Sequence, residues 1–323
     1  MGIVVGYETF IGMRMETDNQ SPYNTTNNGG TISGFSGTDA NLSAFGASSP
    51  EIFLPINGDE GIGEIPNFAD LTAADGTGYS TKFQSLGSHA EGNISVFLPP
   101  GCLNYLKQWV YDRGTVLGQA NQTKSATVWV QAGGTCRRIV GVKVNSAEFD
   151  IAKSQPAVCN LACYGYGEHM VSSISFSAPS WWYDAVYGGD SIVVQVDGSE
   201  TKQLDSVRIS IANELDDDPH RLWSSNYPRH LFCRDREVTG SLSGDYLGDT
   251  DYKKFCRGAT ATLNAALAKT VGSGSYTATF DLPKIRYDSY SGVNATAQKD
   301  AIRKFNADWK AMTTVGTNDL TWS

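Results

Sequence analysis

Four histidines are the first residues to consider for catalysis, because histidine is the commonest general base in enzymes. They are His89, His169, His220 and His230, and no catalytic motif surrounds any of them. The metalloprotease pattern HExxH, the hydrolase pattern GxSxG and the phosphate-binding pattern GxxxxGKS or GxxxxGKT are absent from the sequence. We therefore assign no catalytic residue and expect a protein that is not an enzyme.

One segment brings histidines and carboxylates together. His220 and His230 lie ten residues apart, and Asp216, Asp217 and Asp218 precede them. Histidine nitrogens and carboxylate oxygens are common metal ligands, so a metal site is conceivable here. The spacing shows no regular ligand pattern, however, and it favours a turn that carries solvated charges. We expect neither a metal nor a cofactor in this protein.

Six cysteines would suit redox chemistry or metal binding if they were paired in the sequence. They are Cys102, Cys136, Cys159, Cys163, Cys233 and Cys256, and none forms a CxxC pair. Cys159 and Cys163 lie four residues apart in an expected strand, where such positions are roughly 13 Å apart, too far for a disulfide. We expect reduced and mostly buried thiols.

The charge of the chain argues against a protein that grips nucleic acid. The net charge is -9, whereas DNA-binding surfaces are basic. Nine acidic residues lie between Arg14 and Lys82, in a segment that has no Lys or Arg and is rich in Gly, Ser, Asn and Thr. This 15–81 segment could be a partly ordered insertion or an acidic face with a role. Its composition favours a solvated loop region.

Length and hydropathy indicate a folded protein outside the membrane. The 323 residues suggest two domains, and 40% of them are hydrophobic, enough to fill cores. No stretch approaches the ~20 consecutive apolar residues of a membrane span, and the N-terminus lacks the regions of a signal peptide. We expect neither a membrane location nor export by a signal peptide.

Short alternating runs dominate the sequence and predict strands, among them ATVWVQA, SVRISIANEL and YTATFDLPKIRYDSY. Only two segments predict helices, Cys102 to Gly114 and Asp249 to Gly258, and each ends at a glycine. The apolar faces of these helices consist of Leu103, Leu106, Trp109 and Val110 in the first and of Tyr252, Phe255 and Cys256 in the second.

The two expected helices bring the strands around them into register, which indicates a duplication. In each half one strand precedes the helix and several strands follow it. The preceding strands are EGNISVFLP and REVTGSLSGDYL, and the tail strands are SSISFS and DLTWS. We therefore expect a mainly β protein with two tandem antiparallel sandwich or barrel domains, each with one packed helix. The expected domains are 1–179, which carries the acidic insertion, and 180–323.

A long loop separates two alternating strands of the second half. SVRISIANEL and LFCRDREVTGSLSGDYL predict a hairpin, and its loop, roughly Glu214 to Pro228, is too long for a mere turn. Aromatic residues anchor interfaces and charges set their register, so this loop is a candidate assembly contact. The alternative is an exposed loop without a role. The candidate contact residues are Glu214, Asp216, Asp217, Asp218, Trp223 and Tyr227.

The run from Leu204 to Pro283 resembles the tail tube, or major tail, proteins of long-tailed bacteriophages. In that family a strand of the form xSVxISIxNxLxxxP precedes a long loop, and a strand of the form EVTGSxSxxYxxxxxYxxFxxGxxxxL leads into a helix. This chain has LDSVRISIANELDDDP and REVTGSLSGDYLGDTDYKKFCRGATATL at these places. The match covers about a quarter of the chain, and the duplication extends it to the rest.

The resemblance implies a structural virion protein in its two-domain form. Such proteins assemble into flat rings, trimeric when two tube domains are fused, and the rings stack into a hollow tube. The hairpin loop reaches the neighbouring ring, and DNA passes through an acidic lumen without specific binding during ejection. The implied partners are other copies of the chain, the tape measure protein, and the tail terminator and tip proteins. The implied location is the phage tail, with assembly in the host cytoplasm.

Two other classes of protein share this composition. One is a carbohydrate-binding or receptor-binding viral β-sandwich, with Trp181, Trp182, Tyr183 and Tyr187 as a sugar platform. Burial of these aromatics at the start of the second domain is favoured, because large aromatics are usually mostly buried. The other class is a capsid decoration protein, which the duplication only weakly disfavours.

Overall fold

A computed structural model gives the fold of most of the chain, and the structural statements below concern the residues that it describes. These are 9–16, 49–58, 61–71, 82–116, 119–132, 134–171, 174–175, 186–189, 191–200, 204–216, 231–245, 250–271, 274–291, 304–312 and 320–323. No helix among them is long and apolar enough to cross a membrane.

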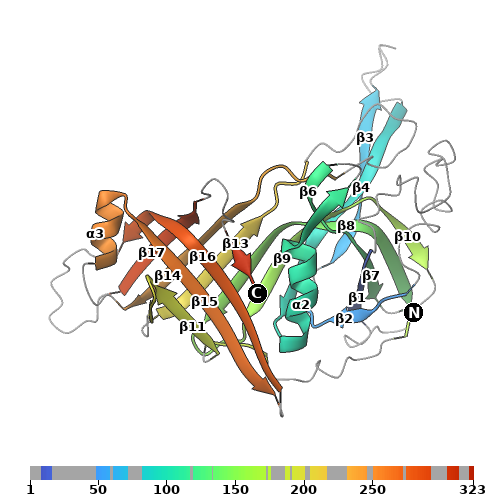
Figure 1. Ribbon diagram of the computed structural model, residues 1–323. Helices are drawn as coiled ribbons and strands as arrows, with labels where there is room; N and C mark the ends of the chain where they lie inside the picture. The colour runs from blue at the N-terminus through green and yellow to red at the C-terminus, as the bar shows by residue number, and fades with distance from the viewer. Residues whose placement is uncertain are drawn as a thin grey trace.

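The protein is mainly β, as the alternating runs predicted (Figure 1). The elements of the first half are β1 (Thr9–Met15), β2 (Ile52–Leu54), β3 (Ile62–Leu71), β4 (Lys82–Phe97), η3 (Pro100–Cys102), α2 (Leu103–Leu106), η4 (Lys107–Tyr111), β5 (Arg113–Val116), β6 (Gln119–Thr123), β7 (Ala126–Ala132), β8 (Thr135–Ala152), β9 (Val158–Gly165) and β10 (Gly167–Val171). Those of the second half are β11 (Ile192–Val196), β12 (Ser199–Glu200), β13 (Leu204–Ala212), β14 (Glu237–Asp245), α3 (Thr250–Arg257), β15 (Thr260–Val271), β16 (Gly274–Ser291), β17 (Lys304–Ala311) and β18 (Thr321–Trp322).

Six strands of the first half form a closed ring of hydrogen-bonded neighbours. β1 lies between β2 and β7, β7 pairs with β8, β8 with β9, and β9 with β4. The chain after β2 closes the ring on β4, where the Asn57 N–H donates to the Ser95 carbonyl at 2.7 Å and the Phe97 N–H donates to that of Pro55 at 2.8 Å. The side chains inside the ring are buried, so it forms a packed barrel.

β8 is long enough to serve both halves. Its first part pairs with β7 and β10, and its second part pairs with β9 and β13. The strand bends at Gly141, which has φ +66, and a Cβ at this position would lie 1.8 Å from the ring of Tyr166. Only glycine therefore fits the bend. A bulge between Val144 and Ser146 follows and adds local twist.

The second half repeats the strand pairing of the first. The β13–β14 hairpin corresponds to the β3–β4 hairpin, and the series β14, β17, β16 corresponds to β4, β9, β8. β15 lies between β11 and β16 as β7 lies between β1 and β8, while β12 and β18 pair as β2 and β10 do. The repeat expected from the order of the strands thus extends to their hydrogen-bonded partners.

Two expectations for the first half are wrong in detail. The 15–81 segment is not simply a solvated loop region, because it contains β2 and β3, and β3 is the counterpart of β13. The tail strand is β10, which precedes the expected SSISFS; Ile174 and Ser175 of that run lie in no strand. β10 can pair with β8 because the chain continues in the same direction along β8 after β9, and at this step the Tyr166 N–H donates to the Val140 carbonyl at 3.0 Å.

The first predicted helix is confirmed but ends early. The helical turns run from Pro100 to Tyr111, and Asp112 is already extended, so Arg113 and Gly114 belong to β5. Its expected apolar face is buried, namely Leu103, Leu106, Trp109 and Val110. The indole N–H of Trp109 donates to the Val142 carbonyl at 2.9 Å, which ties the helix to β8.

The second predicted helix is confirmed as α3 and ends where expected. Gly258 has φ +61, and the Ala259 N–H donates to the Lys254 carbonyl at 2.9 Å, which closes the last turn. Phe255 stacks on Tyr290 of β16 with ring centroids 6.3 Å apart. The expectation that Cys256 belongs to the packed face is wrong, because this side chain is exposed. The other five cysteines are buried free thiols, as predicted.

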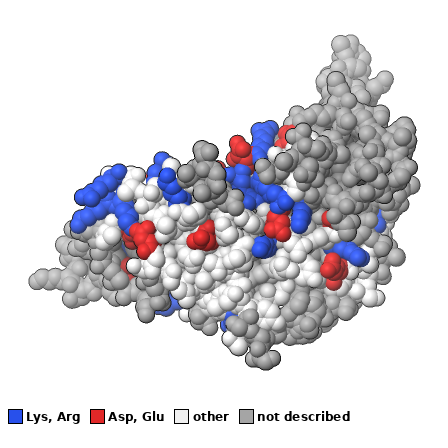
Figure 2. Space-filling model, viewed as in Figure 1, with Lys and Arg blue, Asp and Glu red and all other residues white. Residues whose placement is uncertain are grey.

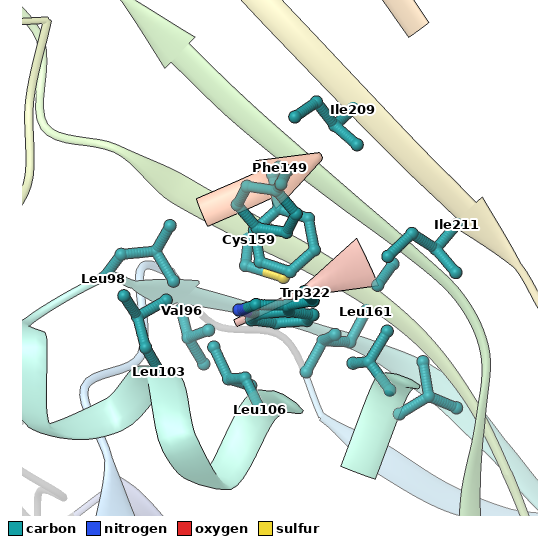
Figure 3. Packing of buried hydrophobic residues seen from close by; sticks show 14 of the residues in the cluster. Val96, Leu98, Leu103, Leu106, Phe149, Cys159, Leu161, Ile209, Ile211 and Trp322 are labelled. Carbon is teal, nitrogen blue, oxygen red and sulfur yellow. The ribbon is translucent and has the colours of Figure 1, made fainter. Parts of the chain in front are cut away.

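A single core joins the two halves (Figure 3). Trp322 of β18 lies between the two halves, with its ring centroid 5.2 Å from that of Phe149 of β8 and 4.8 Å from that of Phe280 of β16. In Figure 3, Leu103 and Leu106 of α2 lie below and to the left of the Trp322 ring, and Ile209 lies above Phe149. The C-terminal strand therefore packs where the halves meet.

Candidate assembly interface

The two halves are joined by the pairing of β8 with β13. The register runs from Ser146 opposite Ala212 to Ala152 opposite Ser206. As a result, eight strands lie side by side in the order β3, β4, β9, β8, β13, β14, β17, β16. The junction between the repeats is thus an ordinary antiparallel ladder, the kind of contact through which separate chains also join.

A buried asparagine fixes the end of this ladder. Asn213 is fully buried, and its backbone N–H donates to the Asn145 carbonyl at 2.7 Å. Its side-chain amide donates to the carbonyls of Val110 at 3.0 Å and Val144 at 3.1 Å, and its Oδ1 accepts from Arg113 at 3.2 Å. Because every one of these groups belongs to the first half, Asn213 sets the position at which the long hairpin of the second half leaves the sheet.

The returning arm of the hairpin is also held by the first half. The Lys143 ammonium donates to the Leu231 carbonyl at 2.8 Å, and the Cys233 N–H donates to Oε1 of Gln122 at 2.8 Å. The Arg236 guanidinium lies 4.5 Å from the centre of the Tyr111 ring and donates to the Tyr111 carbonyl. Both arms of the hairpin base are therefore anchored on the neighbouring repeat.

Two buried ionisable groups support this base. The Glu16 carboxylate accepts hydrogen bonds from Ser125 at 2.5 Å, Thr127 at 2.8 Å and the Gly141 N–H at 3.0 Å. Burial raises the pKa of Glu16, and these hydrogen bonds partly oppose the rise. Burial also lowers the pKa of Lys143 to about 8. Glu16, Lys143 and their hydrogen-bond partners thus form a buried polar cluster near the hairpin base.

The outward face of the eight-stranded sheet is polar. On β13 the inward side chains Val207, Ile209 and Ile211 are buried, and the residues between them face away from the core. β14 and β17 alternate in the same way. The outward residues are mainly small or charged, including Ser206, Arg208, Ser210, Thr239, Ser241, Ser243, Asn306 and Asp308 on the second half and Asn93, Ser95, Asn160, Glu148 and Asp150 on the first.

The basic side chains on this outward face have acidic neighbours. Arg208 lies 3.5 Å from Glu148 and 3.3 Å from Asp150, across the β8–β13 junction. Further pairs on this face are Lys310 with Glu237, Lys304 with Asp205 and Asp245, and Arg286 with Asp288. In the view of Figure 2, Lys and Arg gather along the upper margin, and the broad area below is mostly uncharged. The bases named here are therefore neutralised by acidic partners, and the part of this face that the structure describes does not resemble a DNA-gripping surface.

The structure places two of the six candidate contact residues. Glu214 and Asp216 lie where the hairpin leaves the sheet, and the backbone bonds from Asp216 to Phe232 at 2.8 Å and from Arg234 to Glu214 at 3.0 Å continue the ladder past β13. The predicted hairpin itself is confirmed by the pairing of β13 with β14. The other candidates, Asp217, Asp218, Trp223 and Tyr227, lie outside the described residues.

The alternative sugar platform loses one of its members. Tyr187 is fully buried, and its backbone bridges Leu98 and Ala157, so its ring is not available to a glycan. Trp181, Trp182 and Tyr183 lie outside the described residues. So do His220 and His230, and no group of His, Cys, Asp and Glu in the described part of the chain could hold a metal ion.

Sequence reasoning missed the residues that anchor the hairpin base. Asn213 carried no signal beyond its place at the end of an alternating run. Lys143 carried none either, because it stands between Val142 and Val144 in a regularly alternating run that predicts an exposed side chain. Glu16 lies within the 15–81 segment, whose polar composition favoured a solvated loop.

Comparison with known proteins identifies the family. The family model described as phage tail tube protein matches residues 9–319. This match confirms the resemblance that was visible from Leu204 to Pro283 and extends it over nearly the whole chain. No curated protein matches the chain.

Proposed function

Because the chain belongs to the phage tail tube protein family, we propose that it is a structural subunit that assembles into rings of three chains, which stack into the hollow tube of a phage tail. The tube serves as the conduit for DNA ejection. The protein has no enzymatic role in this proposal, and its place is in the virion tail, with assembly in the host cytoplasm.

The β8–β13 junction is the observation that carries the proposal. It joins two halves of the same strand pairing edge to edge in one sheet. We propose 1–179 and 180–323 as the two corresponding domains. Repetition of this contact from chain to chain adds units with the same rotation each time, and a head-to-tail contact of this kind generates a closed ring when the rotation closes. Three chains then supply six units.

The polar outward face of the eight-stranded sheet is the proposed wall of the lumen. Its described side chains are mainly small polar or charged ones, and acidic partners neutralise bases such as Arg208 and Lys304. The chain as a whole carries a net charge of -9. A wall of this kind repels a polyanion weakly and does not bind it, so DNA can slide.

The long hairpin of the second half is the proposed contact between stacked rings. Its base is held by Asn213 and Lys143, so the residues beyond Asp216 start from a fixed position. The proposed contact residues remain Glu214, Asp216, Asp217, Asp218, Trp223 and Tyr227. The other proposed partners are the tape measure protein inside the tube and the tail terminator and tip proteins at its ends.

Electron microscopy of the purified, concentrated protein tests this function. The expected result is rings or tubes, with or without the tape measure protein. A chain that stays monomeric under both conditions contradicts the proposal. Shortening the loop between Asp216 and Tyr227 should block stacking and leave rings intact; undiminished tube formation would remove the loop from the proposed contact.

A further inference from the structure

We propose that the free edge of β16 pairs with β3 of a second copy of the chain, in the register that β8 and β13 show within one chain. This inference rests on the proposed function and names the residues of the contact between chains. β16 corresponds to β8, and β3 corresponds to β13, in the repeated pairing described above.

A pair of glycines aligns the two hairpins residue by residue. A Cβ on Gly92 of β4 would lie 2.2 Å from the Gly61 carbonyl oxygen, and a Cβ on Gly240 of β14 would lie 2.1 Å from that of Arg208. In both hairpins the strand that precedes in sequence comes too close for any other residue. Gly92 therefore corresponds to Gly240, and the surrounding sequences GNIS and GSLS agree.

Two bulges align the other strands independently. β8 has its bulge after Val144, and pairing with β9 resumes at Ser146 opposite Ala162. β16 has its bulge after Tyr287, and pairing with β17 resumes at Ser289 opposite Asp308. Ser146 therefore corresponds to Ser289.

The two alignments agree where they meet. Ala162 on β9 is opposite Asn93 of β4, and Asp308 on β17 is opposite Ser241 of β14. Asn93 and Ser241 each follow the aligned glycine by one residue. Because the glycine marker and the bulge marker give the same correspondence, one register follows for the whole sheet.

This correspondence converts the junction within the chain into a contact between chains. Ser146 opposite Ala212 becomes Ser289 opposite Ile65 of the second copy, and Ala147 opposite Ile211 becomes Tyr290 opposite Glu64. The next pair is Ser291 opposite Gly63. The two repeats of one chain and of its neighbour then share one uninterrupted sheet.

Both edges suit this partner. Within the described residues, β16 beyond Arg286 has β17 as its one partner strand, and β3 has β4 alone. Ile65 is 41% exposed, and a neighbouring strand would cover part of its side chain. Pro66 corresponds to Asn213, whose N–H donates to the Asn145 carbonyl in the internal ladder. Proline has no N–H, so the ladder between chains lacks this last hydrogen bond.

A side chain occupies the β3 edge in the single chain. The Glu64 N–H donates to the Glu168 carboxylate at 3.2 Å, and the Glu168 N–H donates to the Glu64 carboxylate at 3.4 Å. Arg137 lies 3.5 Å from the same Glu168 oxygen. Glu64 corresponds to Ile211, whose N–H faces β8. In the ring, the Glu64 N–H therefore donates to the Tyr290 carbonyl of the neighbouring chain instead of to the Glu168 carboxylate. Until then Glu168 covers an edge that would otherwise be open to unspecific pairing.

Paired cysteines test the register. The substitutions Ile65→Cys and Ser289→Cys are made together in the full chain, with Cys256→Ser to remove the exposed native thiol. The assembled protein is oxidised and examined on a denaturing gel without reductant. We expect covalent products of more than one chain, because opposite residues of an antiparallel pair lie about 4.5–5.5 Å apart, within disulfide reach.

Two matched variants control for folding and register. Ser146→Cys with Ala212→Cys, the internal counterpart, should close a disulfide within single chains. Ile65→Cys with Ser291→Cys should give less multi-chain product by roughly fivefold or more, because this diagonal pair lies about 7–8 Å apart.

The possible results distinguish the register, the edge contact and the proposed function. Preferential linkage of Ile65→Cys with Ser289→Cys supports the register. If micrographs show rings while this pair fails to link chains and the internal control closes, the edge contact is wrong and the function stands. Equal or better linkage of the diagonal pair overturns the register alone. Absence of rings in the unsubstituted protein overturns the proposed function and this contact with it.

Discussion

The helices of the two repeats occupy corresponding places and differ in burial. In the first repeat Trp109 and Val110 are fully buried, and the carbonyls of Val110 and Tyr111 accept hydrogen bonds from Asn213 and Arg236 of the second repeat. In the second repeat α3 has no buried residue and packs on β16 through partly exposed aromatic rings.

A pair of corresponding cations shows the same difference. Lys143, just before the bulge of β8, is 2% exposed beneath the hairpin base. Its counterpart in β16, Arg286, has a side chain that is 48% exposed and pairs with Asp288. The first repeat is covered because the second repeat follows it in the chain. The second repeat has the same strand pairing, but no further repeat of its own chain follows it. In the proposed ring, the first repeat of the next chain covers it instead.

The largest expected effect concerns the first helix. Trp109→Ala should lower the free energy of unfolding by about 3–5 kcal/mol, because it empties a core site and removes the bond to Val142. Phe255→Ala in α3 should cost the unassembled chain less than half as much, since that ring is only partly buried. Urea unfolding of both variants measures the difference. Equal losses would contradict the contrast between the helices.

The buried lysine should make stability depend on pH. The pKa of Lys143 is lowered to about 8 in the folded chain, so between pH 8 and 10.5 this side chain binds more protons in the unfolded chain. The contribution of Lys143 to stability therefore rises with pH, by at most about 3 kcal/mol. Lys143→Met should lack this contribution. Arg286→Met is the control, and its pH dependence should match that of the unsubstituted chain. The measurement is the free energy of unfolding of all three proteins at pH 7.5 and pH 10. The same pH dependence in Lys143→Met as in the unsubstituted chain would contradict the prediction.

The aligned glycines should respond alike. Gly92→Ala and Gly240→Ala should each destabilise the chain by about 1–3 kcal/mol, because the added methyl group meets a backbone oxygen. Gly134→Ala, with open space around its Cβ, is the control and should change little. Thermal unfolding measures all three. A tolerated alanine at only one of the two aligned positions would break the correspondence between the hairpins.

The smallest effect is expected at the charged surface of the junction. Arg208→Ala removes two exposed ion pairs across β8 and β13 and should cost no more than about 1 kcal/mol. The loss should shrink further in high salt. A larger loss in urea unfolding would mean that side chains rather than the backbone ladder hold the repeats together.

Sequence periodicity was sufficient wherever one face of an element is buried. It predicted the β13–β14 hairpin, the first helix and the repeated order of strands, because buried and exposed positions recur regularly there. The second helix, which has no buried residue, was predicted with the help of its terminating Gly258. It missed β3, which contains Gly63 and Pro66 and whose apolar residues do not alternate. An edge strand of this kind is specified by its partner β4 rather than by its own pattern.

The anchoring residues could not be predicted because their burial is a property of the assembled fold. Asn213 and Glu16 are polar, and polar residues are usually exposed. Their hydrogen-bond partners, such as Val110 and Ser125, are about a hundred residues away in the sequence. The duplication showed which strands correspond, but the junction between β8 and β13 became visible only in three dimensions.

The mass of the assembled protein tests the central claim most directly. Native mass spectrometry of the purified chain should show a species of three chains, each of 34.8 kDa, because three pairs of repeats close the ring. A single chain at every concentration would contradict the account of the second repeat as a unit that awaits its neighbour.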